Sequence, residues 1–274
     1  PALLMRLAER HRISMIFAVP AQLAMLLDHS DFAPERLRSL TTIVLGGAPA
    51  ARDLIERAES AMPWLTCARA YGSTETGHLA AQFRPDRERV YEGVNQPGGR
   101  LEIEVFSSPG VAAAPGEIGE VATRGPHLMR EYLGDAAATS EYFRSGDTDG
   151  RWGWMGDLAM KHAGYITLVG RSRDMILSGG YNIYPIELEE ALATHRDVAE
   201  CAVFAMPDAT WGELPVAAVV ARGPARDAVA MMAHVAQRVA RHKRVRRIFF
   251  VDRIPRTPAG KVQRHILRQQ CLGD

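Results

Sequence analysis

The stretch Leu40-Thr41-Thr42-Ile43-Val44-Leu45-Gly46-Gly47-Ala48-Pro49 decides the fold of this chain. It predicts an apolar strand over residues 40–45 that runs into a glycine turn, with a helix following over Ala51–Ala61. A further strand over Thr66–Ala70 ends in the polar turn Tyr71–Gly77. Strands that alternate with helices predict a parallel α/β sheet whose strand-end loops gather at one edge, where ligands usually bind.

The same alternation begins at the start of the chain and changes after residue 85. Residues 1–85 are expected to be α/β, and the additional elements here are helix Leu3–Arg10, strand Ile13–Val19 and helix Ala21–His29. Residues 90–170 read as short strands punctuated by glycine and proline, which predicts an antiparallel, barrel-like subdomain. The strands expected there are Leu101–Phe106, Gly119–Arg124, Asp157–Lys161 and Tyr165–Val169.

The last part of the chain, residues 171–274, is expected to form a small α+β domain. We therefore predict two domains, 1–170 and 171–274. The acidic side chains of Glu187, Glu189 and Glu190 are expected to face solvent. The expected elements are helices Pro185–His195, Ala228–Arg241 and Val262–Gln270 with strands Glu200–Ala205, Val216–Ala221 and Ile248–Val251.

Composition indicates a globular protein without a strongly charged surface. The 274 residues are 47% hydrophobic and 24% charged, with a formal net charge of +1, so nothing in the overall charge favours nucleic acid or an anionic membrane. The most apolar stretch, Ile13–Leu27, is too short to cross a bilayer. Three scattered cysteines, Cys67, Cys201 and Cys271, lack metal-ligand spacing, and we expect reduced thiols in a cytoplasmic protein.

Positive charge is concentrated near the end of the chain. Residues 238–268 contain many arginines and lysines but only one acid, Asp252. Such a run is typical of a solvated helix face, and a docking surface for a polyphosphate ligand is the functional alternative. Lys261, one of only three lysines, follows the turn Thr257-Pro258-Ala259-Gly260. An ammonium on a flexible stem can follow a phosphate oxygen in a way that a planar guanidinium cannot, although a solvated lysine would look the same in sequence.

Four glycine-containing turns could bind a nucleotide. Tyr71–Gly77 combines an aromatic ring, hydroxyls and a carboxylate, which suit phosphate oxygens and Mg²⁺. Gly46–Pro49 could line a flat ring, and Trp154–Leu158 offers an acid for ribose hydroxyls. Gly170–Asp174 could supply a ribose ligand and a flexible joint. Each turn alone is equally consistent with an ordinary loop.

In this order and spacing the turns resemble the adenylate-forming superfamily, which includes acyl- and aryl-CoA synthetases, peptide-synthetase adenylation domains and beetle luciferases. The resemblance covers nearly the whole chain, and the sequence of Ser178–Glu187 is most similar to that of the acyl-CoA synthetase branch. The matching segments are Gly46–Pro49, Tyr71–Glu75, Gly116–Leu133, Gly156-Asp157, Gly170-Arg171, Ser178–Glu187 and Pro255–Arg268.

The resemblance implies ATP, Mg²⁺ and CoA as cofactors and a carboxylic acid as substrate. In the family, the carboxylate attacks the α-phosphate of ATP to give acyl-AMP and pyrophosphate, and a thiol then displaces AMP. Thr74 would contact the α-phosphate, Glu75 would bind Mg²⁺, and Lys261 would bridge the acyl carboxylate and the α-phosphate. The other implied ligands are Gly46, Gly47, Ala48, Tyr71 and Gly72 for adenine and its surroundings, and Asp157 and Arg171 for the ribose.

The resemblance also implies a rotation of residues 171–274 between the two half-reactions. Arg173 occupies the hinge position, and the rotation would bring Gly179, Gly180 and Tyr181 beside the pantetheine of CoA. One departure is serious, because the family's Ser/Thr/Gly-rich phosphate loop, which lies upstream of this region, is absent.

The expected function is therefore an acyl-CoA synthetase whose N-terminal portion is missing, so that the 274 residues should not adenylate efficiently alone. The alternatives are a non-catalytic fragment that binds a nucleotide or a partner, and a peptide-synthetase adenylation domain. No nucleic-acid partner or transmembrane segment is expected, and an oligomer remains open.

Overall fold

The computed structural model of the chain describes residues 1–48, 50–82, 94–95, 102–144, 151–162, 165–224, 226–257 and 260–273. By its internal contacts the chain divides into two compact units, one of residues 1–155 with 159–168 and the other of 156–158 with 169–274. Our domain boundary after residue 170 stays a prediction. None of the helices in the described ranges is both long enough and apolar enough to span a lipid bilayer.

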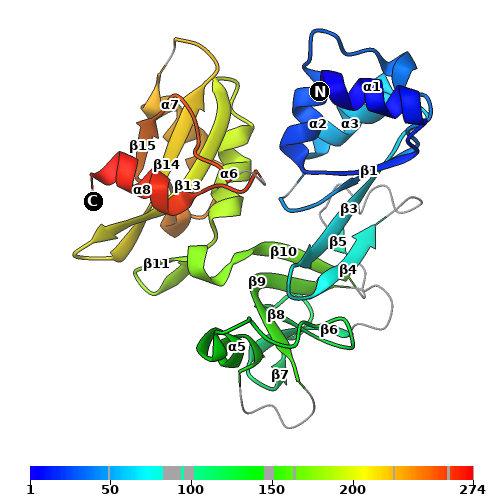
Figure 1. The fold of residues 1–274 in the computed structure, drawn as a ribbon. Coiled ribbons are helices and arrows are strands. Elements are labelled where there is room, and N and C mark those ends of the chain that lie inside the picture. Colours follow the sequence, from blue (N-terminus) through cyan, green and yellow to red (C-terminus); the bar gives the residue numbers. More distant parts are fainter. Residues whose placement is uncertain are drawn as a thin grey trace. The chain divides into compact units, whose positions relative to one another are not determined.

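The apolar strand expected over residues 40–45 is an inner strand of a four-stranded sheet. Strands β1 (Met15–Ala18), β2 (Thr42–Leu45) and β3 (Thr66–Ser73) are parallel, and β4 (Gly77–Gln82) pairs antiparallel with β3. Figure 1 shows helices α1, α2 and α3 grouped beside these strands. Their bounds are Ala2–His11 for α1, Pro20–Leu27 for α2 and Arg52–Ala61 for α3, with the short helix η1 at Pro34–Leu37.

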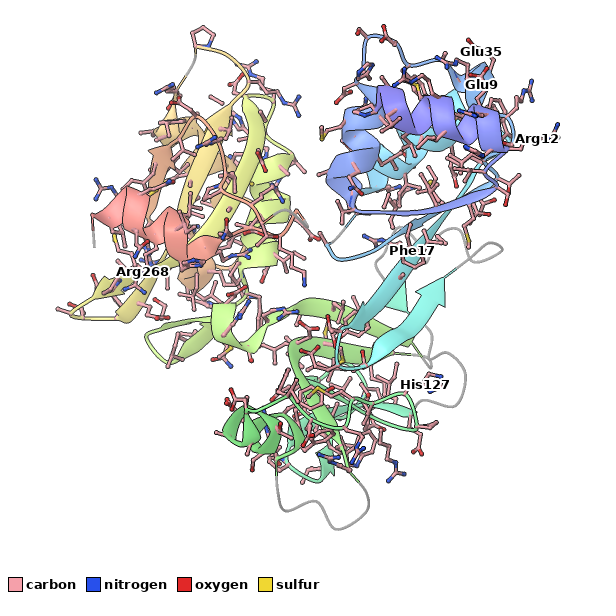
Figure 2. The ribbon with its side chains drawn as sticks, viewed as in Figure 1. Glu9, Arg12, Phe17, Glu35, His127 and Arg268 are labelled. Carbon is pink, nitrogen blue, oxygen red and sulfur yellow. The ribbon has the colours of Figure 1, made fainter. Side chains whose placement is uncertain are left out.

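Alternation along the strands explains the core of this layer. Ile16 and Ala18 of β1 pack with Ile43 and Leu45 of β2 into the cluster that the helices cover. The intervening Phe17, labelled in Figure 2, points to the other face, and its exposed fraction is 65%. Side chains two apart share a face of a strand, so one face of β1 is buried and the other is not.

Residues 94–171 contribute a six-stranded sheet with the order β5-β10-β9-β8-β6-β7. This order has two ends, so the described residues form an open sheet, and the barrel-like part of our prediction is not a closed barrel. Helix α5 (Ala136–Phe143) follows β8, and the sequence analysis did not predict it. The strands are β5 (Val94–Asn95), β6 (Glu102–Ser108), β7 (Val111–Ala112), β8 (Ile118–Arg124), β9 (Gly153–His162) and β10 (Tyr165–Arg171).

The C-terminal unit is built on a five-stranded sheet with helices on both faces. Val203 and Val219 belong to one hydrophobic cluster together with residues of α6 and α7, while Phe204 and Ala218 belong to another that contains Leu267 of α8. The strands are β11 (Ile176–Ser178), β12 (Tyr181–Ile183), β13 (Val198–Asp208), β14 (Gly212–Ala221) and β15 (Arg247–Phe250). The helices are η2 (Ser172–Asp174), α6 (Pro185–Ala193), α7 (Ala228–Ala236), η3 (Arg241–Lys243) and α8 (Arg264–Leu272).

The predicted fold class is confirmed: an α/β part, a β-rich part and a small α+β part follow one another along the chain. One helix prediction was too long, because α7 ends at Ala236 and residues 237–240 form a turn that leads to η3. The backbone N–H of Gln237 donates to the carbonyl oxygen of Ala233, and the N–H groups of Arg238 and Val239 donate to the carbonyl oxygen of Val235.

Candidate functional site

The polar turn between β3 and β4 is held by its own hydroxyl groups. Thr76 is fully buried, and its Oγ1 accepts a hydrogen bond from the backbone N–H of Ser73 at 3.0 Å. The same hydroxyl donates to the carbonyl oxygen of Gly77 at 3.0 Å. Thr74 is therefore carried at an exposed position on a fixed turn, next to Glu75.

Glu75 is hydrogen-bonded through both its backbone and its side chain. The N–H of Met129 donates to the Glu75 carbonyl oxygen at 2.8 Å, and the hydroxyl of Tyr132 donates to Glu75 Oε1 at 2.7 Å. Burial and the neighbouring carboxylate together raise the pKa of Tyr132 to about 12, which keeps the phenol protonated as a donor at neutral pH.

The residues expected around adenine lie at the ends of β2 and β3. Gly46 donates its N–H to Ala18 O at 3.1 Å, and Gly47 and Ala48 continue the turn. Tyr71 is mostly buried in the cluster that includes Val105 and Val121, and its hydroxyl hydrogen-bonds Met155 Sδ at 3.3 Å. The Tyr71 ring is therefore packed in the core of the β-rich part. Gly72, the next residue, is exposed.

Asp157 and Arg171, the expected ribose ligands, form an ion pair. Their Oδ1 and Nε atoms are 2.9 Å apart, and the Asp157 side chain is 10% exposed. Two adjacent polar groups of opposite charge, one in the middle of β9 and one at the end of β10, can each hydrogen-bond a hydroxyl, because a hydroxyl both donates and accepts.

The loop that carries Lys261 is a hydrogen-bonded hairpin. The N–H of Thr257 donates to Lys261 O at 2.8 Å, and the N–H of Lys261 donates to Thr257 Oγ1 at 3.2 Å. Pro258 and Ala259 lie outside the described residues. Lys161 and Lys243 form ion pairs with Glu104 and Glu187, whereas Lys261 is exposed and has no ion-pair partner among the residues that the structure describes.

Two arginines anchor the flanks of this loop. Arg256 pairs with Glu200 of β13 and donates to Gly260 O at 2.7 Å. Arg264 donates to Val203 O at 3.0 Å and to Glu189 Oε1 at 2.6 Å, and it contacts Asp174 Oδ2 at 3.4 Å.

Two of the three acids of α6 are not simply solvated, as we had expected all three to be. Glu187 pairs with Lys243, and Glu189, whose side chain is 19% exposed, also accepts from the N–H of Val203 at 2.8 Å. Glu189 is therefore largely buried, Glu187 is ion-paired but 38% exposed, and Glu190 is exposed as expected. Helical spacing alone could not show the two pairings, because the partners are far away in sequence.

The expected hinge and CoA segments belong to the C-terminal unit. Arg173 is exposed in η2, beside Asp174. Gly179 has a φ of +57°, and a Cβ there would lie 2.6 Å from the ring of Trp211, so only glycine fits. Gly180 follows, and the exposed Tyr181 stacks on His242 with ring centroids 4.4 Å apart.

The candidate metal ligand among the site residues is Glu75. Among the described residues, no group of three or more histidine, cysteine, aspartate or glutamate side chains could hold a metal. Mg²⁺ commonly binds through one or two carboxylates together with substrate phosphates. Glu75 on its fixed turn fits that mode.

Two family models match two separate parts of the chain, and both parts contain residues of the candidate site. One, described as AMP-binding enzyme, matches residues 1–133, and the other, AMP-binding enzyme C-terminal domain, matches residues 187–261. The chain belongs to the AMP-binding enzyme family. The first match contains the Glu75 turn and Tyr132, and the second ends at Lys261.

Individual relatives match nearly the whole chain. It is 34% identical to the 4-coumarate–CoA ligase-like 6 protein of Oryza sativa subsp. japonica over 97% of its residues and 45% of that protein. It is also 34% identical to indoleacetate–CoA ligase of Aromatoleum aromaticum, over 95% of this chain and 50% of that one. The ATP-bound structure of MatB from Rhodopseudomonas palustris is 26% identical with a TM-score of 0.88, covering 98% of this chain and 53% of that chain. This AMP-binding family member thus spans about half the length of the curated relatives it matches.

Sequence reasoning missed Tyr132, Asp174 and Arg264 as site-supporting residues. Tyr132 and Arg264 were quoted within matching segments but given no role. Their partners are 57 to 90 residues away, so only the folded chain reveals them.

Proposed function

We propose that this chain forms the AMP-binding and C-terminal parts of an ATP-dependent acyl-CoA synthetase. The observation that carries the proposal is the contrast among the three lysines. Two of them are neutralised by glutamates, while Lys261 is exposed on a hydrogen-bonded loop anchored at both flanks. Such a loop can deliver an uncompensated positive charge to a bound anion.

In the proposed reaction, a carboxylate oxygen of the substrate attacks the α-phosphorus of ATP and pyrophosphate leaves. The sulfur of CoA then attacks the acyl carbonyl carbon, AMP leaves, and the thiol proton passes to solvent. Lys261 would lie between the two anions in the first step. An ammonium at 4 Å contributes on the order of 4 kcal/mol at an effective dielectric constant near 20, and it favours the transition state because charge grows on the phosphate.

The remaining site residues receive supporting roles in this proposal. Gly46, Gly47, Ala48, Tyr71 and Gly72 would border adenine, Asp157 and Arg171 would bind the ribose, and Thr74 would contact the α-phosphate. Glu75 would hold Mg²⁺, which neutralises phosphate charge when bound. Arg173 would act as the hinge, with Gly179, Gly180 and Tyr181 lining the pantetheine.

We propose aromatic carboxylic acids as the first substrates to test, because the names of both CoA-ligase relatives contain an aromatic acid. Carboxylate-dependent exchange of pyrophosphate into ATP measures the first step. CoA-dependent release of AMP measures the second. The complete enzyme, with an N-terminal half that contains the phosphate loop, is expected to show both activities.

The 274-residue chain alone is expected to show neither activity, and exchange by this chain would contradict our proposal that it needs further residues. If the complete protein binds AMP but exchanges no pyrophosphate with any acid, the chain belongs to a non-catalytic nucleotide-binding protein. If exchange occurs but only a carrier-protein thiol accepts the acyl group, it belongs to a peptide synthetase.

A further inference from the structure

Glu75 is fixed from outside its own turn by one short segment between β8 and α5. That segment supplies the N–H of Met129 to the Glu75 carbonyl oxygen and the hydroxyl of Tyr132 to Glu75 Oε1. Figure 2 labels His127, which lies on this segment. Both the backbone and the carboxylate of Glu75 are therefore held by residues more than fifty positions away.

Tyr132 is itself held by the start of α5. Its N–H donates to Thr139 Oγ1 at 2.9 Å, and that hydroxyl donates to Asp135 O at 2.7 Å. Asp135 caps the helix by accepting from the N–H of Ala138 at 2.9 Å. The backbone of Tyr132, from which the phenol extends, is thus held by hydrogen bonds.

The ring of Tyr132 is also packed against a second tyrosine. The Tyr132 and Tyr142 rings meet edge to face with centroids 6.2 Å apart. Behind Tyr142, a Cβ added at Gly153 would lie 2.6 Å from the Tyr142 hydroxyl oxygen, so the ring fills all the space available. The Tyr142 hydroxyl is buried and has no hydrogen-bond partner in the described part of the chain.

We propose that Tyr132 is a positioning residue that orients the Glu75 carboxylate toward the divalent cation accompanying the nucleotide. The inference rests on the proposed function, which gives Glu75 the cation. A carboxylate has about four lone-pair positions, so accepting one phenol hydrogen does not prevent coordination. A neutral phenol fixes the orientation without cancelling the negative charge, whereas an arginine or lysine in its place would compete with the cation.

The two tyrosines provide a matched pair of variants. Tyr132→Phe removes the hydroxyl that contacts Glu75, and Tyr142→Phe removes a neighbouring hydroxyl that has no described partner. In the 274-residue chain, we expect Tyr132→Phe to speed hydrogen exchange of the Met129 amide and of residues 73–77 about tenfold, while Tyr142→Phe leaves both unchanged. Equal exchange in Tyr132→Phe and the parent chain would overturn the proposal.

Cation binding is measured separately with Mn²⁺ and ATP as the probe. Paramagnetic broadening of the amide resonances of residues 73–77 reports binding even when it is weak. We expect Glu75→Gln to abolish the broadening, Tyr132→Phe to weaken the apparent Mn²⁺ affinity about tenfold, and Tyr142→Phe to leave it unchanged.

The outcomes separate this inference from the function on which it rests. If Glu75→Gln abolishes broadening and Tyr132→Phe does not weaken it, the positioning role is wrong and the cation site stands. If the parent chain shows no broadening, or Glu75→Gln leaves it intact, the cation role of Glu75 fails and the inference fails with it.

Discussion

The turn that carries Glu75 and the loop that carries Lys261 are ordered in different ways. Glu75 is hydrogen-bonded through its own carboxylate and its own backbone to a segment distant in sequence. Within the described residues, Lys261 is bonded through its backbone and not its side chain, and the anchors are the flanking Arg256 and Arg264. One site fixes the functional atoms, and the other fixes the base from which a side chain extends.

The difference agrees with the chemistry proposed for each residue. A carboxylate that holds a cation works best when its orientation is set in advance, because no ordering is then required on binding. A lysine that must approach two anions and then withdraw needs a fixed backbone and a mobile ammonium. Glycine-containing turns that look alike in sequence can therefore differ in what they hold in place: the side chain at Glu75, and the backbone at Lys261.

The largest expected effect comes from removing the mobile charge. Lys261→Ala in the complete enzyme should reduce adenylation by roughly 10²–10³ while leaving thioester formation from supplied acyl-AMP largely intact. Pyrophosphate exchange and thioester formation measure the two half-reactions. Lys161→Ala, which removes a lysine already paired with Glu104, is the control and should not change their ratio. An equal loss in both half-reactions would refute the assignment.

Arg264→Met tests the inner anchor of the lysine loop. The change leaves the largely buried Glu189 and Asp174 carboxylates without this partner, and hydrogen bonds to charged groups are worth about 1.5–3 kcal/mol. We expect a loss of that size in the free energy of unfolding of the C-terminal unit, measured by hydrogen exchange of the β13 amides. Exchange at Met129, in the other unit, should not change, and a change there would show that the two regions are not independent.

Gly153→Ala tests the packing behind the first turn. The added methyl would collide with the Tyr142 ring, and overpacking of this kind costs about 1–2 kcal/mol. Exchange at Met129 should rise because α5 and Tyr132 shift with Tyr142, while the lysine loop should be unaffected. Unchanged exchange at Met129 would mean that Tyr142 moves without disturbing Tyr132.

Arg256→Met should have the smallest effect, below about 1 kcal/mol, because its ion pair with Glu200 is more than a third exposed on both sides. Chemical denaturation compared with Arg264→Met measures the difference directly. A loss for Arg256→Met as large as that for Arg264→Met would show that the outer anchor matters equally.

Local sequence was sufficient for much of the fold. Residues 40–61 gave a strand, a turn and a helix within two residues of the observed bounds, because burial and glycine act locally. Local sequence was insufficient to predict α5, because its eight residues have no strong apolar periodicity. It also predicted that Glu189 faces solvent, whereas that side chain is 19% exposed. The candidate ligand residues were readable as motifs, whereas the supporting Tyr132, Asp174 and Arg264 were not assigned a role, and all these roles are proposals.

The order of the elements and the family of the chain can be predicted from sequence, since both depend on short motifs in a fixed order. The side chains that hold those motifs in place are visible only in the folded chain. Tyr132 reaches Glu75 across 57 residues and Arg264 reaches Asp174 across 90. Such contacts form when separate segments pack together, and no periodicity or spacing in the sequence records them.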